Sequence, residues 1–560
     1  IDKRVEEMGA DGRLMPDPNG GVYQVNLAEK ILVTLLSKIA NFIPDTGIWM
    51  NTQRPEWNDA NNALVGTGVS VVTLCYLHRF LNKVVPLFSA LSQETVQLSE
   101  EVAEFLGEVR SVLASHQSSI GAGPVSDTIR KDVMEALGTA AERYRNRIYE
   151  QGFSSVKQTV NLANVIDCLV RARDVSAVSI RSNRRSDGLY HAYNRIAVNT
   201  DGVQIKYLYE MLEGQVAVLS SELLEADESL SLLKTLRNSP LYTARQHSYL
   251  LYPNRQLPSF MARNLVPRTF VESSRLMTTL LSSGNTDLVE QDQSGQVYFA
   301  GKFNNTASVA AALTRLASEG YAEDVAAERV VIENLFSDLF DCANFTGRSG
   351  AMYAYEGLGS IYWHMISKLL LSVMETVRSA EAAGAQSDVL AELQRAYYDV
   401  REGIGFNKAP DVYGAFPTDP YSHTPGFAGA KQPGMSGQVK EEVLTRLLEL
   451  GVQVAGARVA FKPSVLRRSE FLDAPATLHY FDTTGTAQEQ SLQAGELGFT
   501  YCQVPVVMVM ADKASITLHL NDGTTESVAG NELSAAQSEA LFKKNGHYVR
   551  IDVRTDRVMD

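Results

Sequence analysis

The feature that most constrains the fold is a helical period in the apolar residues, which runs through most of the chain. Leu27, Ile31, Leu35 and Ile39 recur every four residues, the spacing that buries one face of an amphipathic helix. Similar patterns occur at 67–91, 93–115, 127–148, 205–236, 303–319, 323–341, 361–383, 387–402 and 436–450. The sequence therefore predicts a mainly α region up to residue 451. Two long connections, 238–302 and 403–435, are predicted to be loops.

Beyond Gly451 the period changes to that of strands. Ile516, Leu518 and Leu520 alternate with polar residues before Asn521-Asp522-Gly523, a strong hairpin signal. Further strands are predicted within 477–492, 498–510 and 547–555. We therefore expect residues 452–560 to form an all-β domain, a sandwich.

Charge and cysteine content exclude several classes of protein. The chain has 560 residues and a net charge of −14, which argues against nucleic-acid and anionic-membrane partners. No apolar stretch is long enough to span a bilayer. Four cysteines, Cys75, Cys168, Cys342 and Cys502, lack metal-type spacing, so we expect reduced, mostly buried thiols and no metal site. Without a leader sequence, a cytoplasmic location is expected.

The first polar cluster is Glu56-Trp57-Asn58-Asp59, just before a predicted helix. A helix N-terminus explains part of it, because Asp and Asn cap helices and carboxylates suit the positive end of the helix dipole. A cap does not require the Trp or the further amides that follow. The cluster is typical of a site that binds a hydroxyl-rich ligand.

The three tryptophans lie near such clusters. Trp49 and Trp57 belong to the first, and Trp363 lies in the stretch YEGLGSIYWH beside Tyr362 and after Glu356. Aromatic faces combined with carboxylate or amide edges suit sugars. Ordinary core packing of the tryptophans is the alternative explanation.

A third stretch enters a helix through Gly434-Met435-Ser436-Gly437-Gln438. Small residues with accessible backbone N–H groups at a helix N-terminus bind anions. The alternative is a plain N-cap by Ser436, with Glu441 and Glu442 in the first turns.

In this order, the three stretches resemble the cellobiose and chitobiose phosphorylases. EWNDANNALVGTGVSV is similar to their Asp-Trp-Asn-Asp segment, YEGLGSIYWH to their Glu-Asn-Gly-Gly…His stretch, and GMSGQVKEEVLTRLLELG to the entry of a late barrel helix. The resemblance covers the sites and roughly half of the chain. It implies an (α/α)6 toroid of six-hairpin type over residues 1–451, followed by a C-terminal β-sandwich over 452–560.

The resemblance also implies inverting cleavage of a glycosidic bond, with phosphorolysis of a β-linked gluco-oligosaccharide as the favoured reaction. Inorganic phosphate is then a co-substrate, and no other cofactor is expected. The general acid is Asp59 or Glu56; Asp59 is favoured because its Trp-Asn-Asp context is retained. The candidates for sugar contacts are Trp57, Asn58, Trp49, Glu356 and Tyr362, and those for phosphate contacts are His364, Ser436 and Gln438.

The chain departs from the family in the spacing of its motifs. The first two are farther apart than the resemblance leads us to expect, so an insertion is predicted around 150–300. Within it, Arg184, Arg185, His191, Tyr193 and Arg268 are candidates for a distal subsite, although solvated surface is favoured for most of them. Because only the helix near 22–43 clearly precedes Glu56, we expect an upstream segment or a second chain to complete the barrel. The alternative is that the helices between 93 and 236 close the ring in a rearranged order. A homodimer is the other partner expected.

Two alternatives to a phosphorylase remain open. A phosphorylase needs one acid, since phosphate is itself a nucleophilic anion. A hydrolase or transglycosylase needs a second carboxylate as base, about 6.5–9.5 Å from the acid, and Glu356, Asp411 and Asp419 are candidates. The other alternative is a carbohydrate-binding or scaffold part of a larger enzyme.

Overall fold

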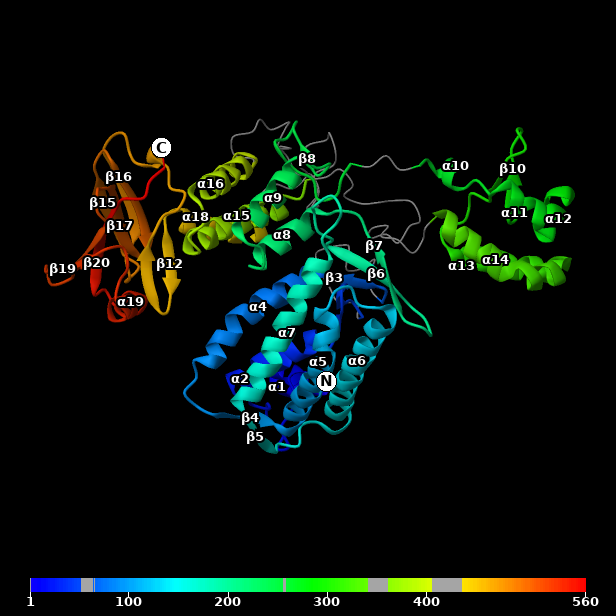
Figure 1. Cartoon of the computed structure of the whole chain (residues 1–560), viewed down its shortest axis with the longest axis horizontal. Coiled ribbons are helices and arrows are strands. Elements are labelled where there is room, and N and C mark those ends of the chain that lie inside the picture. The colour runs from blue at the N-terminus through cyan, green and yellow to red at the C-terminus, as the bar shows by residue number, and fades with distance from the viewer. Residues whose placement is uncertain are drawn as a thin grey trace. The chain divides into compact units, whose positions relative to one another are not determined.

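The computed structural model describes residues 2–51, 64, 66–254, 258–340, 361–404 and 436–559, with the backbone alone at 436–438 (Figure 1). Contacts divide the chain into two units. The first holds residues 1–223, 250–360 and 425–427, and the second holds 224–249, 361–424 and 428–560. The units are described separately below.

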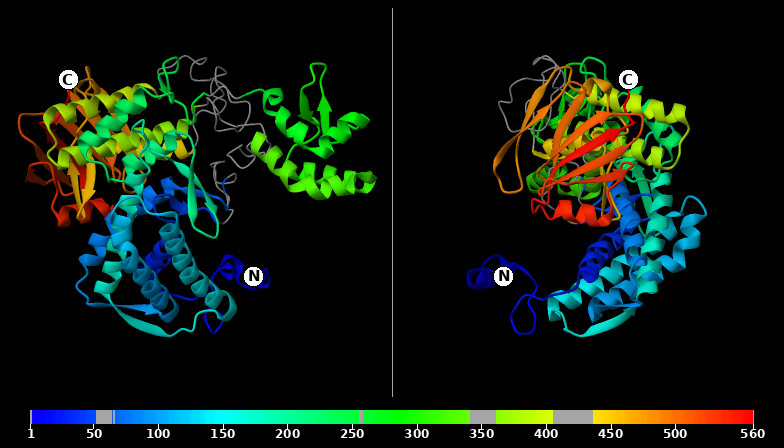
Figure 2. Two further views of the ribbon diagram at one scale, coloured as in Figure 1. Left: turned by 45° about the vertical axis from the view of Figure 1, so that its right-hand side comes forward. Right: turned by 90° about the vertical axis from the view of Figure 1, so that its left-hand side faces the viewer.

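Long helices form most of the first unit and lie side by side (Figure 1, Figure 2). α4 packs against α7, and α5 packs against both α6 and α7. Their bounds are α2 (Leu27–Ile39), α4 (Val71–Ser89), α5 (Glu100–Gly121), α6 (Asp127–Gln151), α7 (Leu162–Ser182) and α8 (Leu212–Ser220), after a short α1 (Asp2–Met8) and a 3₁₀ turn, η1 (Gly9–Arg13). The predicted helices near 22–43, 67–91 and 127–148 are confirmed. The helix predicted at 93–115 is confirmed from Glu100 onward, whereas Thr95–Ser99 form a strand instead.

Two differences from the predicted helices have identifiable causes. α7 was not predicted, because its buried stripe includes the small residues Cys168, Ala172 and Ser176, which carry a weak hydropathy signal. The predicted helix over 205–236 is divided into the end of strand β7, α8 and α9 (Ala226–Arg237).

An antiparallel five-stranded sheet accompanies these helices, in the order β1-β2-β3-β6-β7. Its strands are short: β1 (Phe42–Ile43), β2 (Gly47–Trp49), β3 (Gly68–Ser70), β6 (Tyr193–Val198) and β7 (Val203–Tyr207). A Cβ at Gly47 would lie 2.6 Å from the Ser70 carbonyl oxygen, so the close approach of β2 to β3 requires glycine there. A separate hairpin pairs β4 (Thr95–Ser99) with β5 (Lys157–Asn161).

A buried arginine on α6 fastens the helices to this sheet. The Arg130 guanidinium donates from Nε to the Pro44 carbonyl at 3.1 Å, and from its terminal nitrogens to Val203 at 2.6 Å and Val125 at 2.8 Å. Asp45, also buried, lies 3.7 Å from the same guanidinium. These contacts connect α6 to the β1–β2 turn and to β7.

Residues 258–340 bury a hydrophobic core of their own. Residues from Val266 to Phe340 form one cluster, in which Phe336 stacks edge-on to Phe299 at 5.1 Å. The elements are α10 (Phe260–Arg263), α11 (Arg268–Ser273), α12 (Arg275–Ser283), β10 (Val289–Gln291), β11 (Val297–Phe299), α13 (Thr306–Leu316), the π-turn η2 (Ala317–Tyr321) and α14 (Ala322–Phe340). The predicted helices at 303–319 and 323–341 are confirmed. The predicted loop at 238–302 is wrong, because short elements too brief to show a period fill much of it.

The second unit combines helices with strands. α15 (Trp363–Ala382) packs against α9, α16 (Ser387–Glu402) and α18 (Ser436–Glu449), and these three predicted helix positions at 361–383, 387–402 and 436–450 are confirmed. The hairpin β8 (Tyr242–Thr243) and β9 (Ser248–Tyr249) follows α9. Ser464 then joins the helices to the C-terminal strands, since its hydroxyl donates to Glu381 at 2.5 Å and its carbonyl accepts from Gln394 at 2.7 Å.

The C-terminal strands share a core that runs from Leu450 to Val553. A five-stranded sheet has the order β16-β17-β20-β18-β19, in which β17 and β20 are parallel. The bounds are β12 (Val452–Ala455), β13 (Arg458–Phe461), β14 (Ala476–Phe481), β15 (Ala487–Leu492), β16 (Glu496–Tyr501), β17 (Val504–Met510), β18 (Ser515–Leu520), β19 (Thr525–Ala529) and β20 (Tyr548–Thr555), with η4 (Arg468–Glu470) and α19 (Ala535–Phe542). The predicted hairpin at 521–523 is confirmed as the turn between β18 and β19.

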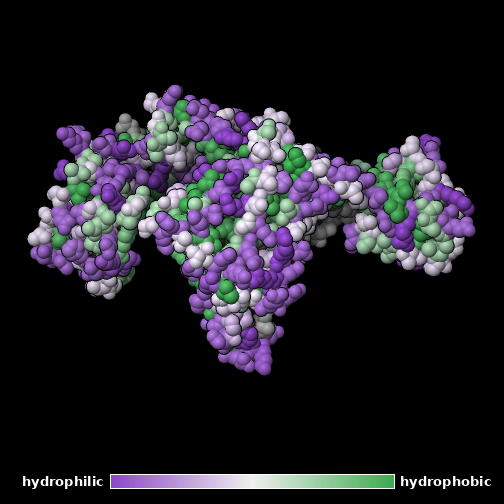
Figure 3. Space-filling view, turned by 60° about the horizontal axis from the view of Figure 1, so that its bottom comes forward, coloured by the Kyte–Doolittle hydropathy of each residue, from purple (hydrophilic) through white to green (hydrophobic). Residues whose placement is uncertain are grey.

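The surface in Figure 3 is mostly hydrophilic, with hydrophobic side chains in scattered patches. In the described ranges, no helix is both long enough and apolar enough to cross a membrane. Cys75 and Cys168 are buried free thiols and Cys502 is a half-buried one, which confirms the prediction for these three. Cys342 lies outside the described residues.

Candidate functional site

The first motif lies outside the described residues, but both ends of its segment are described. Glu56, Trp57, Asn58 and Asp59 belong to 52–63. On either side, the Met50 N–H donates to the Gly68 carbonyl at 2.9 Å, and the Gly66 N–H donates to the Met50 carbonyl at 2.7 Å. Strands β2 and β3 thus hold the two ends of the motif at neighbouring points of one sheet.

Trp49 adds a further hydrogen bond between the two ends of the motif segment. Its indole N–H donates to the Gly66 carbonyl at 3.1 Å, and its ring packs against the cluster of Ile43, Val69 and Ile196. The candidate sugar contact therefore also serves as a structural link between the two ends of the motif segment.

The second motif enters the described region at its last four residues. Glu356 lies outside the described residues, whereas Tyr362, Trp363 and His364 are buried at the start of α15. The Tyr362 carbonyl accepts from the Met365 N–H at 2.8 Å as the first turn closes, and the Tyr362 ring lies edge-on to His364, with centroids 6.0 Å apart. Tyr362 and His364 are thus held side by side.

His364 meets the third motif through a carboxylate. α15 packs against α18, and His364 Nε2 lies 3.5 Å from Glu441 Oε2. Both side chains are more than nine-tenths buried. Helix α18 begins at Ser436, as predicted, so His364 lies near the first turns of the helix that carries Ser436 and Gln438. The side chains of those two residues lie outside the described set, as do Asp411 and Asp419.

Burial and nearby lysines set the protonation of His364. Burial lowers the pKa of the His364 imidazole below its usual value, and the charge on Lys368 lowers it further, while Glu441 acts in the opposite direction. Lys440, whose Nζ lies 3.5 Å from Glu441 Oε1, also lowers that pKa. The result is a mainly neutral ring beside a buried carboxylate.

Glu441 is the functional candidate that sequence reasoning missed. From the sequence, Glu441 was considered only as a residue in the first turns of a helix capped by Ser436. The available signal was its spacing, since Glu441, Thr445 and Glu449 recur every four residues and all three are buried. A polar stripe at helical spacing marks a face that needs polar partners.

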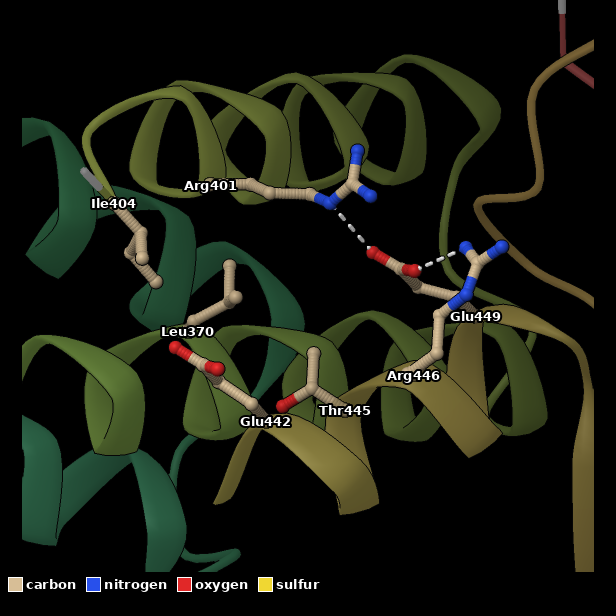
Figure 4. Close-up of a pocket in the computed structure, with 7 residues that line it drawn as sticks. All are labelled: Leu370, Arg401, Ile404, Glu442, Thr445, Arg446 and Glu449. Atoms are coloured by element: carbon tan, nitrogen blue, oxygen red, sulfur yellow. Dashed lines mark hydrogen bonds and ion pairs between the residues drawn. The ribbon is translucent and has the colours of Figure 1, made fainter. Parts of the chain in front are cut away.

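Farther along α18, a small cavity of about 160 Å³ lies between α15, α16 and α18 (Figure 4). Arg401 and Arg446 point toward Glu449 from different helices, at 2.8 Å and 2.6 Å. The cavity is lined by Leu370, Arg401, Ile404, Glu442, Thr445, Arg446 and Glu449. None of the predicted site residues whose side chains the structure describes lines it.

The residues proposed for a distal subsite are not all at the surface. His191 and Tyr193 are buried, and the Tyr193 hydroxyl donates to Glu213 at 2.9 Å. Arg185 pairs with Asp187, whereas Arg268 is almost fully exposed. Solvated surface is therefore wrong for His191 and Tyr193, which are packed among strands.

Comparison with known proteins identifies one segment. Residues 257–343 match the family model described as GH149 phosphorylase insertion domain 2, which coincides with the segment that buries its own core. This match overlaps the predicted insertion from residue 257 to residue 300 and extends beyond it. No curated protein matches the chain. The match supports a glycoside phosphorylase-like family and a carbohydrate-active enzyme, without singling out the cellobiose and chitobiose phosphorylases.

Proposed function

We propose that this protein is an inverting glycoside phosphorylase that cleaves, or in reverse forms, a β-linked gluco-oligosaccharide. The observation that carries the proposal is the match of residues 257–343 to an insertion domain of the GH149 phosphorylases. The order of the three sequence motifs supports it independently. An (α/α)6 toroid with a C-terminal β-sandwich is the architecture that we propose with it.

In the proposed reaction, Asp59 protonates the glycosidic oxygen of the leaving sugar, with Glu56 as the other candidate. Phosphate attacks the anomeric carbon from the opposite face, so its bond to that carbon forms as the glycosidic bond breaks. One displacement inverts the configuration and gives an α-sugar 1-phosphate and a shortened oligosaccharide. General acid catalysis of this kind contributes about 10²–10⁴-fold.

We assign the remaining candidates to binding. Trp57, Asn58, Trp49, Glu356 and Tyr362 would contact the sugars through aromatic faces and polar edges. His364, Ser436 and Gln438 would contact phosphate, since the N-terminus of a helix carries partial positive charge and accessible N–H groups. The contact between His364 and α18 through Glu441 supports this grouping.

The test is product analysis on a panel of β-linked gluco-oligosaccharides, with and without phosphate. We expect release of a sugar 1-phosphate that requires phosphate, and a loss of about 10²–10⁴-fold in turnover in Asp59→Asn. The matched control is Asp512→Asn in an exposed turn, which should leave turnover unchanged.

Three results would redirect the proposal. Equal cleavage with and without phosphate would identify a hydrolase or transglycosylase. Sugar binding without turnover, unchanged in Asp59→Asn, would identify a binding or scaffold protein. An inactive Glu56→Gln beside an active Asp59→Asn would exchange the assignment of the acid.

A further inference from the structure

The buried pair of His364 and Glu441 has a consequence for how the imidazole works. Glu441 is 5% exposed, although it lies on a surface-type helix rich in charge. A buried carboxylate is costly unless it is paired. Its ion-pair partners among the described residues are His364 at 3.5 Å and Lys440 at 3.5 Å, and the Lys440 side chain is 67% exposed. His364 is therefore the partner that shares its buried environment.

This pairing orients the ring. The nitrogen that faces Glu441 is Nε2, 3.5 Å from Oε2 in an ion-pair contact that does not meet hydrogen-bond geometry. A carboxylate next to a ring nitrogen favours a proton on that nitrogen. In the neutral ring Nδ1 is then an acceptor, whereas in the imidazolium both nitrogens are donors. An unprotonated phosphate oxygen that meets the Nδ1 side of the ring therefore needs the doubly protonated form.

We propose that Glu441 is a positioning residue, which orients His364 through Nε2 and stabilises its imidazolium when phosphate binds on the Nδ1 side. The inference rests on the proposed function, because it takes phosphate as the anion that His364 meets. It adds a residue that acts through His364 and makes phosphate binding a proton-linked event.

The surrounding charges favour such a linkage. Burial, Lys368 and Lys440 keep the pKa of His364 low, and Glu441 opposes them. The other helices packed on α15 are α9 and α16. Arg237 and Lys234 of α9 pair with Asp399 and Glu392 of α16, and Arg401 of α16 pairs with Glu449 of α18. A phosphate dianion would add a second negative charge beside the ring. Phosphate binding should then take up a proton and weaken as the pH rises.

The kinetic test is Glu441→Gln, which keeps the side-chain shape and removes the charge. We expect the apparent KM for phosphate to rise about tenfold, which corresponds to about one unit in the pKa of His364. The KM for the sugar should change little, and the pH dependence of the phosphate KM should move toward lower pH. The matched control is Glu442→Gln, the next residue on α18, which should keep the wild-type profile.

A double-mutant cycle separates this role from a purely structural one. In a His364→Ala background, Glu441→Gln should change the phosphate KM by less than about twofold, because the residue through which it acts is missing. An equal effect in both backgrounds would overturn the inference. So would a lower melting temperature of Glu441→Gln with an unchanged pH profile.

A spectroscopic readout keeps the test independent of turnover. With histidine labelled at Cε1, the His364 resonance is the one of nine histidines that is lost in His364→Ala. Inorganic phosphate should raise the pKa of His364 in the wild type and much less in Glu441→Gln. If that shift appears without phosphate-dependent turnover, the proposed function fails and the inference stands. If turnover requires phosphate but the shift is absent, only the inference fails.

Discussion

At the scale of single residues, His191 shows how packing changes the chemistry of a side chain. Its ring stacks on Tyr207 with centroids 4.6 Å apart, and Nδ1 donates to the Leu208 carbonyl at 3.0 Å. Burial, and after it the charge on the nearby Arg185 guanidinium, lower the pKa of His191 to about 4. Protonation would place a second cation in a buried position, so the folded state favours the neutral ring.

This predicts a loss of stability in mild acid. The folded-state pKa lies below the unfolded value of 6.5, so the stabilisation is complete above about pH 6.5 and is lost as the pH falls toward about 4. The expected loss is about 3 kcal/mol across that window. Urea unfolding at several pH values measures it.

The matched variant for that measurement is His191→Gln, which keeps a polar side chain but does not titrate. The wild type should have the larger unfolding free energy at pH 6.5, and its advantage over His191→Gln should shrink as the pH falls to 4. Only the wild type loses the stabilisation that comes from a neutral His191. Parallel curves would show that His191 does not govern acid stability.

At the scale of elements, α18 is a helix whose burial departs from its hydropathy. Val439, Val443 and Leu444 are about half exposed, whereas Glu441 and Glu449 are buried. The reason is that these two buried carboxylates have polar or cationic partners, on α18 itself and on neighbouring helices. For Glu449 these partners are Arg401, Arg446 and Tyr397.

The charge on Glu449 should therefore stabilise the second unit. Glu449→Gln removes the charge of a buried carboxylate and leaves Glu470 as the remaining shared partner of Arg401 and Arg446. We expect a loss of about 1.5–3 kcal/mol of unfolding free energy, the range for hydrogen bonds to charged groups. Denaturant unfolding measures this loss. The comparison variant is Glu489→Gln, which removes an exposed pair with His479 and should cost less than about 1 kcal/mol. Equal losses of unfolding free energy in Glu449→Gln and Glu489→Gln would show that the charge on Glu449 does not stabilise the second unit.

The sequence predicted elements well where apolar residues mark the buried face. The helix at 436–450 was placed to within a residue, because its length and period were clear. Which face of it is buried could not be predicted, since that depends on cations carried by α16. The candidate site shows the same limit. The sequence proposed His364 and the start of α18 as candidates, but Glu441 could be added only once α15 and α18 were seen to pack together.

At the scale of the whole molecule, one segment stands out as a structural module. The cluster from Val266 to Phe340 draws all its members from that range. Glu328 on α14 also accepts from the backbone N–H groups of Arg275 at 2.8 Å and Leu276 at 3.3 Å, which satisfies the first turn of α12. The hydrophobic core and the Glu328 contact with the start of α12 thus both lie within the segment that matches the phosphorylase insertion domain.

We therefore predict that residues 257–343 fold when produced alone. The segment should unfold cooperatively on heating, with a stability of about 3–5 kcal/mol. Circular dichroism in the far and near ultraviolet measures the transition. Phe336→Ala removes a ring that packs against Phe299 and Phe340, at a cost of about 3–5 kcal/mol, and should abolish it. Helical signal without a cooperative transition would show that the segment needs the rest of the chain.

The pairing of β2 with β3 bears on how this protein can change over evolution. Two hydrogen bonds, from the Met50 N–H to the Gly68 carbonyl and from the Gly66 N–H to the Met50 carbonyl, close the segment that carries Glu56 and Asp59. The entropy of that closure depends only weakly on the number of residues between its ends. Insertions or deletions between Asn51 and Leu64 should therefore leave the register of β2 with β3 unchanged, so this part of the chain can vary in length without loss of the supporting sheet.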